Sequence, residues 1–430
     1  MTTNPSAAQM PAVPAIPDSI EATGLSFEFL SDLALKCIYQ SGEFSGQQIA
    51  DYMCLPFFSI VENVLHGFVE EKYCEVMAGT SYLASTWKYA LTDNGRKKAL
   101  EAISRNSYTG PCPVSLAYYS RMAKHQSPNL REIHMPEVAS ALSDLVTDQV
   151  LAEKLGPAVN SCRSIFLYGP PGNGKTSVGE RIRRMFGGSV WVPYAIEVDN
   201  EVIRVLDPSI HQKVALNDSQ KAALGTWDRR WELCDRPLVI VGGELTLAAL
   251  DLTYDPNSRF YLAPIQVKAN GGILLIDDFG RQRVEPRELL NRWIVPLEKR
   301  EDYLTLRTGK QVVVPFELLV VFATNIEPRQ LVDEAFMRRI RYKIRLSDPS
   351  HEEFREVLKR CCASRRVLYD DDAVSYLIKK HYQDAKRLMR SCHPRDIVDQ
   401  IADRAKFLGI PPVLSKEAID RACETYFVEL

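Results

Sequence analysis

The apolar positions in the first quarter of the chain follow helical spacing and then change to strand-like runs. One helical stripe extends from Leu30 to Ile38, a second helix is predicted over 46–53, and Pro56 is suited to open a third. Strand-like runs follow at 73–77 and 87–91, joined by Ala78 to Ser81, and a last helix is expected from Thr92 onward. This order predicts a small α+β domain.

From about residue 135, buried strand-like runs alternate with helical segments. Such alternation predicts a parallel α/β sheet with helices on both faces. The strand-like runs are 164–168, 238–241, 273–276 and 318–323. After Pro349 the spacing is helical to the end, which predicts an all-α module with helices over 351–363, 371–387, 394–407 and 415–425.

These changes of pattern divide the 430-residue chain, whose length suits two or three domains. Gly110, Pro111 and Pro113 favour a linker after the first domain. The predicted parts are a disordered lead at 1–24, a small domain at 25–105, a linker at 106–134, an α/β domain at 135–347 and a helical domain at 348–430.

Composition adds few constraints. Hydrophobic residues make up 46% and charged residues 25%, and a formal net charge of −2 gives no general reason to expect nucleic acid or an anionic membrane as a partner. The Pro- and Ala-rich start lacks a basic region followed by an apolar one, and no apolar run is long enough to span a membrane. Ten cysteines without CxxC spacing indicate reduced thiols in a cytoplasmic protein.

The strongest motif lies between the strand-like run 164–168 and a helix, which is the setting that a phosphate-binding P-loop requires. Its glycines let backbone N–H groups face phosphate oxygens, Lys175 supplies a charge for the β- and γ-phosphates, and Thr176 offers a hydroxyl to Mg²⁺. The residues expected to bind ATP are Gly169, Pro170, Pro171, Gly172, Asn173, Gly174, Lys175, Thr176 and Ser177.

A second motif supplies the acids that ATP hydrolysis needs. The apolar run 273–276 ends in Asp277 and Asp278. Asp277 is the candidate partner of Mg²⁺ together with Thr176, and Asp278 is the candidate base that activates water.

Together with three further segments, these motifs resemble those of the AAA+ ATPases over residues 135–400. The run 320–325 is similar to the sensor-1 strand, with Asn325 placing the attacking water. Segment 335–340 resembles the one that carries the arginine finger, and 392–396 resembles sensor 2, with Arg395. The resemblance implies an ATP hydrolase that uses ATP and Mg²⁺ and forms a ring-like homo-oligomer. Arg339 is the favoured finger, acting in trans, with Arg338 and Arg341 as alternatives.

The resemblance narrows to the branch with a pre-sensor-1 hairpin, and MoxR-type ATPases are the most similar group. A helix ending at 298–300 is followed by strands at 303–306 and 312–314 around a turn at 307–310. A second hairpin is expected over 192–206, turning at Asp199-Asn200. This family implies that hydrolysis is coupled to the remodelling of a protein client or complex.

Two departures from the family stand out. Asp278 occupies a position where the family has Glu, which sets the carboxylate back by about 1.5 Å, and a misplacement of that order costs ~100-fold in rate. We therefore expect slow hydrolysis unless the backbone compensates. No aromatic pore-loop pattern precedes Asp277, which leaves substrate threading without support.

The small domain at 25–105 resembles a winged helix, a fold that often binds DNA. Residues 43–71 nevertheless contain no Lys or Arg, the wing at 78–86 is uncharged, and the basic cluster is confined to 96–98. Duplex binding requires cations that neutralise phosphates, so a protein client or adaptor is the favoured partner over DNA. The alternatives are a DNA-tethered regulatory ATPase and a slowly hydrolysing, nucleotide-gated assembly switch.

Overall fold

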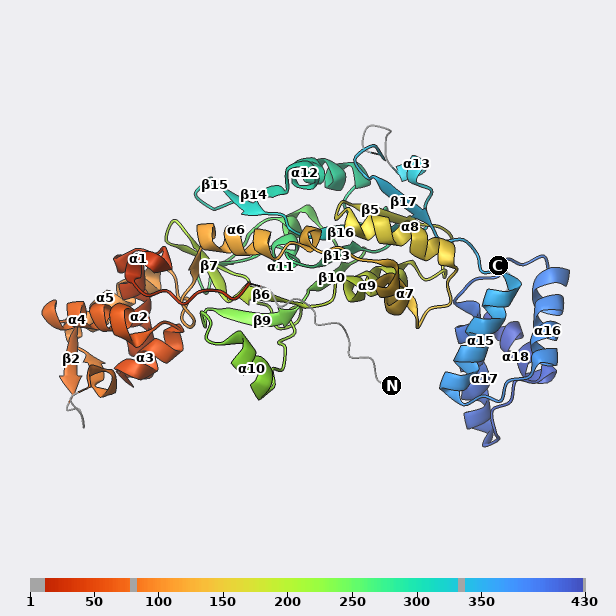
Figure 1. The fold of residues 1–430 in the computed structure, drawn as a ribbon, viewed down its shortest axis with the longest axis horizontal. Helices are drawn as coiled ribbons and strands as arrows, with labels where there is room; N and C mark the ends of the chain where they lie inside the picture. The colour runs from red at the N-terminus through yellow and green to blue at the C-terminus, as the bar shows by residue number, and fades with distance from the viewer. Residues whose placement is uncertain (1–11, 78–82, 332–336, 428–430) are drawn as a thin grey trace.

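The computed structural model describes residues 12–77, 83–331 and 337–427. Three parts follow one another along the molecule in Figure 1: a mainly helical N-terminal unit, a central region that holds the larger sheets, and a helical C-terminal unit. Within the described ranges, no single helix is long and apolar enough to cross a membrane. Only the helical segments 46–53 and 57–70 together have the length and apolar composition of a membrane span, and the two are bent by 82° relative to each other.

The N-terminal unit contains the helices and strands expected from the sequence, together with a short strand, β1, that was not foreseen. The expected turn at 78–81 lies outside the described residues. The helix expected after Pro56 is interrupted, because Phe58 is extended and Ser59 has φ of 69°. The elements are α2 (Phe27–Ser41), β1 (Glu43–Ser45), α3 (Gly46–Met53), α4 (Glu62–Glu70), β2 (Cys74–Met77), β3 (Lys88–Leu91) and α5 (Asp93–Arg105), with the antiparallel order β1-β3-β2.

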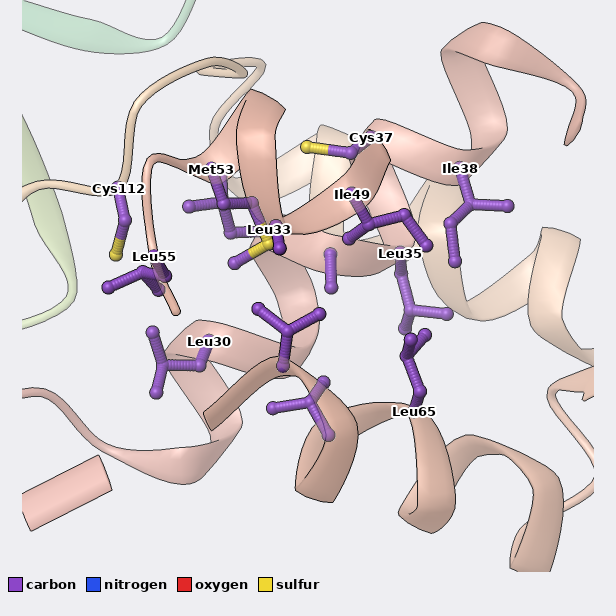
Figure 2. Close-up of a cluster of buried hydrophobic side chains, with 14 of the residues drawn as sticks. Leu30, Leu33, Leu35, Cys37, Ile38, Ile49, Met53, Leu55, Leu65 and Cys112 are labelled. Atoms are coloured by element: carbon purple, nitrogen blue, oxygen red, sulfur yellow. The ribbon is translucent and has the colours of Figure 1, made fainter. Parts of the chain in front are cut away.

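The core of this unit is continuous with the central region. Leu30, Leu33, Ile49 and Leu65 are fully buried between its helices (Figure 2). The same cluster includes Cys112, whose N–H donates to Met53 O at 2.7 Å. Ala195 and Val202 of the central region also belong to it. The N-terminal unit is therefore packed on the central region through apolar contacts.

The predicted linker at 106–134 is wrong as a linker, because most of it packs into the central region. It forms β4 (Val114–Ser115), which pairs in parallel with β7 (Ala195–Val198), and α6 (Leu116–His125). Tyr119, Met122 and Ala123 are buried at helical spacing, which anchors α6 in the second apolar core. Gly110, Pro111 and Pro113 bend only the approach to this structure.

The predicted disordered lead is also corrected where it is described. Pro14 and Pro17 are buried, and Pro14 O accepts from the Asp228 N–H at 3.0 Å. A short helix, α1 (Ile20–Thr23), follows with the Ser19 side chain as its N-cap. Prolines keep their φ fixed, so a proline-rich segment loses little entropy when it lies along a surface. Residues 1–11 lie outside the described part of the chain.

The predicted parallel sheet is confirmed. Its order is β10-β13-β16-β5-β17, all strands are parallel, and helices cover both faces. One face packs on α7 (Met135–Leu142), α8 (Gln149–Asn160) and α9 (Lys175–Phe186), and the other on α12 (Pro286–Lys299). The strands are β5 (Ile165–Tyr168), β10 (Leu238–Val241), β13 (Ile273–Ile276), β16 (Leu319–Thr324) and β17 (Tyr342–Arg345), the last of which was not predicted.

A second, five-stranded sheet of order β11-β12-β8-β7-β4 lies beside the first. The predicted turn at Asp199-Asn200 is present, and both residues have left-handed φ angles. The first strand of the predicted hairpin is interrupted at Tyr194, so that β6 and β7 belong to different sheets. The hairpin expected after α12 is present as β14 (Glu301–Thr305) and β15 (Gln311–Pro315). The other strands are β6 (Ser189–Pro193), β7 (Ala195–Val198), β8 (Glu201–Arg204), β9 (Trp231–Asp235), β11 (Thr253–Asp255) and β12 (Phe260–Leu262).

The helical C-terminal unit forms as predicted and has its own apolar core, which includes Phe354, Leu377 and Ile397. Ser350 opens its first helix with a reciprocal capping box to Glu353, two hydrogen bonds that fix where the unit begins. Its elements are α15 (His351–Arg365), α16 (Asp371–Leu377), the π-helical segment 378–384, α17 (His393–Leu408) and α18 (Lys416–Tyr426).

Candidate functional site

The loop between β5 and α9 makes a tight turn at the carboxyl end of the central sheet. Gly169 has φ of 140°, and a Cβ at this residue would lie 2.3 Å from Leu346 O. Gly172 has φ of 80°, and a Cβ there would lie 2.5 Å from the Cys392 sulfur. Only glycine combines these conformations with such close approaches, so the loop shape depends on both residues.

Lys175, the first residue of α9, extends back across this loop. Its Nζ donates to Gly169 O at 3.0 Å, to Pro170 O at 2.9 Å and to Asn325 Oδ1 at 2.5 Å. Burial lowers the pKa of Lys175, while the negative charges of Asp277 and Asp278 oppose that shift. The ammonium group is thus held by neutral oxygens beside two carboxylates, where an anionic ligand would find a preformed positive charge.

Thr176 and Asp277 meet at the edge of the loop. Thr176 Oγ1 donates to Asp277 Oδ2 at 2.7 Å, and Asp277 follows β13 directly. A hydroxyl and a carboxylate are hard oxygen ligands, which fit Mg²⁺ held jointly with substrate phosphates. No group of three or more His, Cys, Asp and Glu suited to a metal occurs in the described part of the chain, so this pair would need oxygens from a ligand to complete a magnesium site.

The Asp278 carboxylate faces the end of the neighbouring strand. Asp278 has φ of 48°, in the left-handed region, and its Oδ1 accepts from Asn325 Nδ2 at 3.1 Å. Asn325 follows β16, so the two residues project from adjacent parallel strands. Lys175, Asn325 and Asp278 therefore form one hydrogen-bonded chain across the site.

The C-terminal unit closes over the loop through backbone contacts. Cys392 N donates to Gly172 O at 2.9 Å, and Ser391 N donates to Asn173 Oδ1 at 3.2 Å. The Asn173 side chain also donates to Asp348 Oδ1 at 2.8 Å, and Asp348 pairs with Arg390. Asn173 therefore connects the P-loop to the C-terminal unit, a role that its place in the motif did not indicate.

A cavity of about 640 Å³ opens beside these contacts, within the range of small-molecule sites. Gly172, Gly174 and Ser177 line it from the P-loop side, and Val357 and Arg395 line it from the C-terminal unit. Residues 144–148, between α7 and α8, form a third wall together with Val150 and Leu151 in the first turn of α8, and the sequence reasoning missed this wall. The one feature of the sequence that could have indicated this wall is its group of apolar residues, among them Val150. In the structure these residues are half-buried or exposed.

The predicted arginines lie in two different places. Arg395 borders the cavity, and its Nε donates to Asp396 at 3.0 Å while two-thirds of the side chain remains exposed. Arg339 pairs with Glu298 at 2.6 Å, at the end of α12 in the same chain. Arg338 and Arg341 are exposed, and residues 335 and 336 of this segment lie outside the described part.

An aromatic cluster fixes the start of α17 behind Cys392. His393 is buried and stacks on Tyr382, while Tyr426 and Phe427 contact its ring edgewise. Burial, assisted by the positive charge of Arg390, lowers the pKa of His393 to about 4. The imidazole is therefore neutral near pH 7, and its Nδ1 accepts from the Arg390 N–H at 3.3 Å.

Comparisons with known proteins match parts of the chain. Residues 350–425 match a family described as a domain of unknown function (DUF8689), and no curated protein matches in a sequence search. Many solved structures are similar, and these include the following three. The RuvB Holliday junction branch migration motor of Thermotoga maritima has 15% identity, coverage of 66% of this chain and 70% of that chain, and a TM-score of 0.37. NtrX from Brucella abortus has 14% identity, coverage of 79% and 68%, and a TM-score of 0.41. The FIGL-1 AAA domain in complex with ADP has 12% identity, coverage of 70% and 80%, and a TM-score of 0.34. These TM-scores lie below 0.5, so the assignment of the site rests on the geometry of this chain.

Proposed function

We propose that the chain is an ATPase of the AAA+ type that couples ATP hydrolysis to the remodelling of a protein client or complex. One observation carries the proposal: Lys175 hydrogen-bonds to Asn325, which hydrogen-bonds to Asp278, while Thr176 hydrogen-bonds to Asp277. A phosphate-binding cation, a pair of oxygen ligands and a water-orienting amide with an adjacent carboxylate thus converge at the end of one sheet. These are the parts that phosphoryl transfer to water requires.

Each side chain has a role that its position supports. Lys175 and the N-terminus of α9 supply positive potential for the phosphates. Thr176 and Asp277 would hold Mg²⁺, which would supply charge neutralisation to the β- and γ-phosphates. Asn325 orients the attacking water, and Asp278 accepts its proton.

Assembly into a ring is the second part of the proposal. Hydrolysis in related sites is accelerated by an arginine from a neighbour, and Arg339 is the favoured residue for that role, ahead of Arg338 and Arg341. In this chain Arg339 pairs with Glu298 across a partly exposed surface, a contact that contributes little to stability and can be exchanged for a phosphate.

The surface of the N-terminal unit favours a protein over DNA as its binding partner. Its three helices, three-stranded sheet and closing helix are in keeping with a winged helix. The solvent-facing side of α4 nevertheless carries Asn63, His66 and Glu70 and no Lys or Arg. Asp51 of α3 pairs with Arg229 of the central region at 2.7 Å, which is a contact with the chain's own ATPase part. We favour an adaptor or client protein as the ligand, with a MoxR-type organisation supported by the β14–β15 hairpin.

The proposal is tested by measuring ATP turnover and DNA binding with the full chain. The native protein should release phosphate from MgATP, and Asp278→Asn should bind ATP but turn it over at least ~100-fold more slowly. Tight ATP binding with turnover no faster than that of Asp278→Asn would instead identify a nucleotide-gated switch. Salt-dependent DNA binding at submicromolar concentration, lost on deleting residues 25–105, would support a DNA-tethered regulator.

A further inference from the structure

One side chain makes three hydrogen bonds within the turn that follows β13. Gln282 Nε2 donates to Asp277 O at 2.9 Å and to Asp278 O at 3.2 Å, while Gln282 Oε1 accepts from the Gly280 N–H at 2.8 Å. The amide orientation is determined by these partners, because the carbonyls need a donor and the N–H needs an acceptor. One glutamine thus links three backbone groups of the turn that carries both acids.

The turn changes the direction of Asp278. Successive side chains of an extended strand point to opposite faces of the sheet. Leu275 and Asp277 share the face that packs on α9, so an extended Asp278 would point with Ile276 toward the face that packs on α12. The left-handed conformation of Asp278 redirects its carboxylate to Asn325.

The far side of the turn is anchored to β16. Phe279 N donates to Ala323 O at 2.7 Å, Thr324 Oγ1 donates to Phe279 O at 2.6 Å, and the Phe279 ring is fully buried. These contacts hold Phe279 to β16 but make no hydrogen bond to the Asp278 carbonyl. The Asp278 C=O and the Phe279 N–H belong to one peptide plane, which β16 holds on one side. On the other side the plane is held by Gln282 and by the Arg281 N–H, which donates to Asp278 O at 2.9 Å. The Asp278 N–H donates in addition to Asp277 Oδ1 at 2.9 Å.

We infer that Gln282 is a positioning residue that keeps the Asp278 carboxylate within reach of the water that attacks ATP. The inference rests on the proposed ATPase function and explains how Asp can serve at this position. Gln282 contacts only the protein backbone in these bonds, so its effect on hydrolysis passes through the turn that carries both acids. Asp277 is also held by β10, because its N–H donates to Val241 O at 2.8 Å, so the loss of Gln282 should displace Asp278 more than Asp277. Binding of ATP depends on the P-loop, which Gln282 does not contact in these bonds.

The test compares Gln282→Ala and Gln282→Glu with the native chain. The first removes all three hydrogen bonds, and the second places an oxygen opposite the two carbonyls while retaining the size of the side chain. Both variants should lose ~10–100-fold in kcat, because a displacement of about 1 Å costs that much, while KM and Kd for ATP stay within about two-fold. Glu285→Gln, an exposed side chain three residues further along the same loop, is the matched control and should retain the native kcat.

Two further measurements separate positioning from general damage. Adding Asp278→Glu to Gln282→Ala should recover at least about ten-fold of the lost kcat, since a longer side chain depends less on the turn, and the two substitutions should be strongly non-additive. Hydrogen exchange of the nucleotide-free protein should be faster over 277–283 in Gln282→Ala and unchanged over 169–176. A native kcat in Gln282→Ala, or a loss that Asp278→Glu does not relieve, would overturn the inference.

If the proposed ATPase activity itself is wrong, the measurements give a different set of results. If the native chain releases no more phosphate than Lys175→Ala, the ATPase proposal is wrong whatever Gln282 does. Hydrogen exchange then decides the structural part alone: unchanged exchange over 277–283 in Gln282→Ala refutes the restraint, and faster exchange confined to that segment supports it.

Discussion

The Asn325 side chain joins Lys175 to Asp278: its Oδ1 accepts from Lys175 Nζ at 2.5 Å and its Nδ2 donates to Asp278 Oδ1 at 3.1 Å. The amide therefore satisfies a cation with its oxygen and an anion with its nitrogen. A bound triphosphate would compete for Lys175, which would release the amide oxygen toward solvent. The state of the P-loop and the orientation of the candidate base are thus connected through one residue.

Asn325 substitutions test this connection. Asn325→Ala should retain ATP affinity within a few-fold and lose ~100-fold in kcat, because the water-orienting amide is gone. Asn325→Asp keeps an acceptor for Lys175 but sets a negative charge against Asp278, so it should lose at least as much. Single-turnover rates with saturating MgATP measure the effect, and full activity of Asn325→Asp would show that the amide nitrogen has no role.

Lys175→Ala tests the phosphate site. We expect tight ATP binding to be lost, with a fall in affinity of at least ~10–100-fold, because a charged hydrogen bond contributes about 1.5–3 kcal/mol. The fold should remain intact, since the Lys175 ammonium contacts loop carbonyls and Asn325 and not the apolar core. Calorimetric titration with ATP gives the affinity, and far-ultraviolet circular dichroism checks the fold. Native affinity in this variant would refute the P-loop assignment.

Arg339→Ala tests the trans arginine. Nucleotide affinity should be nearly unchanged, and turnover should fall by ~10³-fold or more, as for other arginine fingers. Mixing Arg339→Ala with Lys175→Ala chains should restore part of the activity, because one chain then offers an intact pocket and the other an intact finger. If assembly is verified by light scattering and no activity returns, the finger is Arg338 or Arg341 or acts within one chain.

Arg395 tests whether the C-terminal unit senses the γ-phosphate. It borders the cavity at the first turn of α17 and has a substantial exposed area available for a ligand. We expect residues 394–407 to exchange hydrogen more slowly with a slowly hydrolysed ATP analogue than with ADP, and this difference to vanish in Arg395→Ala. Equal protection by both nucleotides in the native chain would leave Arg395 as a surface partner of Asp396.

The buried His393 predicts a loss of stability in acid. Its pKa of about 4 in the folded chain lies below the value of about 6.5 expected when unfolded. Between these values the unfolded state binds more protons, so the contribution to stability is complete above about pH 6.5 and is lost as the pH falls through about 4. His393→Gln should show a smaller decrease of the urea midpoint over this window than the native chain, and identical slopes would exclude His393 as the cause.

Features with a local cause could be predicted from the sequence. The P-loop needs only a strand, a run of glycines and a helix, so Gly169 to Thr176 identify it without knowledge of the remaining fold. The alternation of apolar runs with helical segments likewise predicted the parallel sheet and the helices of the C-terminal unit. Asp277 and Asn325 were recognisable because each directly follows a buried strand, and the ends of parallel strands meet at one edge.

Other features depended on contacts between distant segments. The apolar stripe of α6 is short, and two of the strands that it contacts, β7 and β15, lie far along the chain, so composition alone indicated a linker. Residues 144–151 became a wall of the cavity only when the C-terminal unit folded against them. The orientation of Asp278 was decided by the left-handed turn that Gln282 restrains, because a carboxylate's reach is set by backbone direction as well as by side-chain length. The residue types at the site followed from local sequence, whereas their distances followed from which strands and turns the tertiary structure placed side by side.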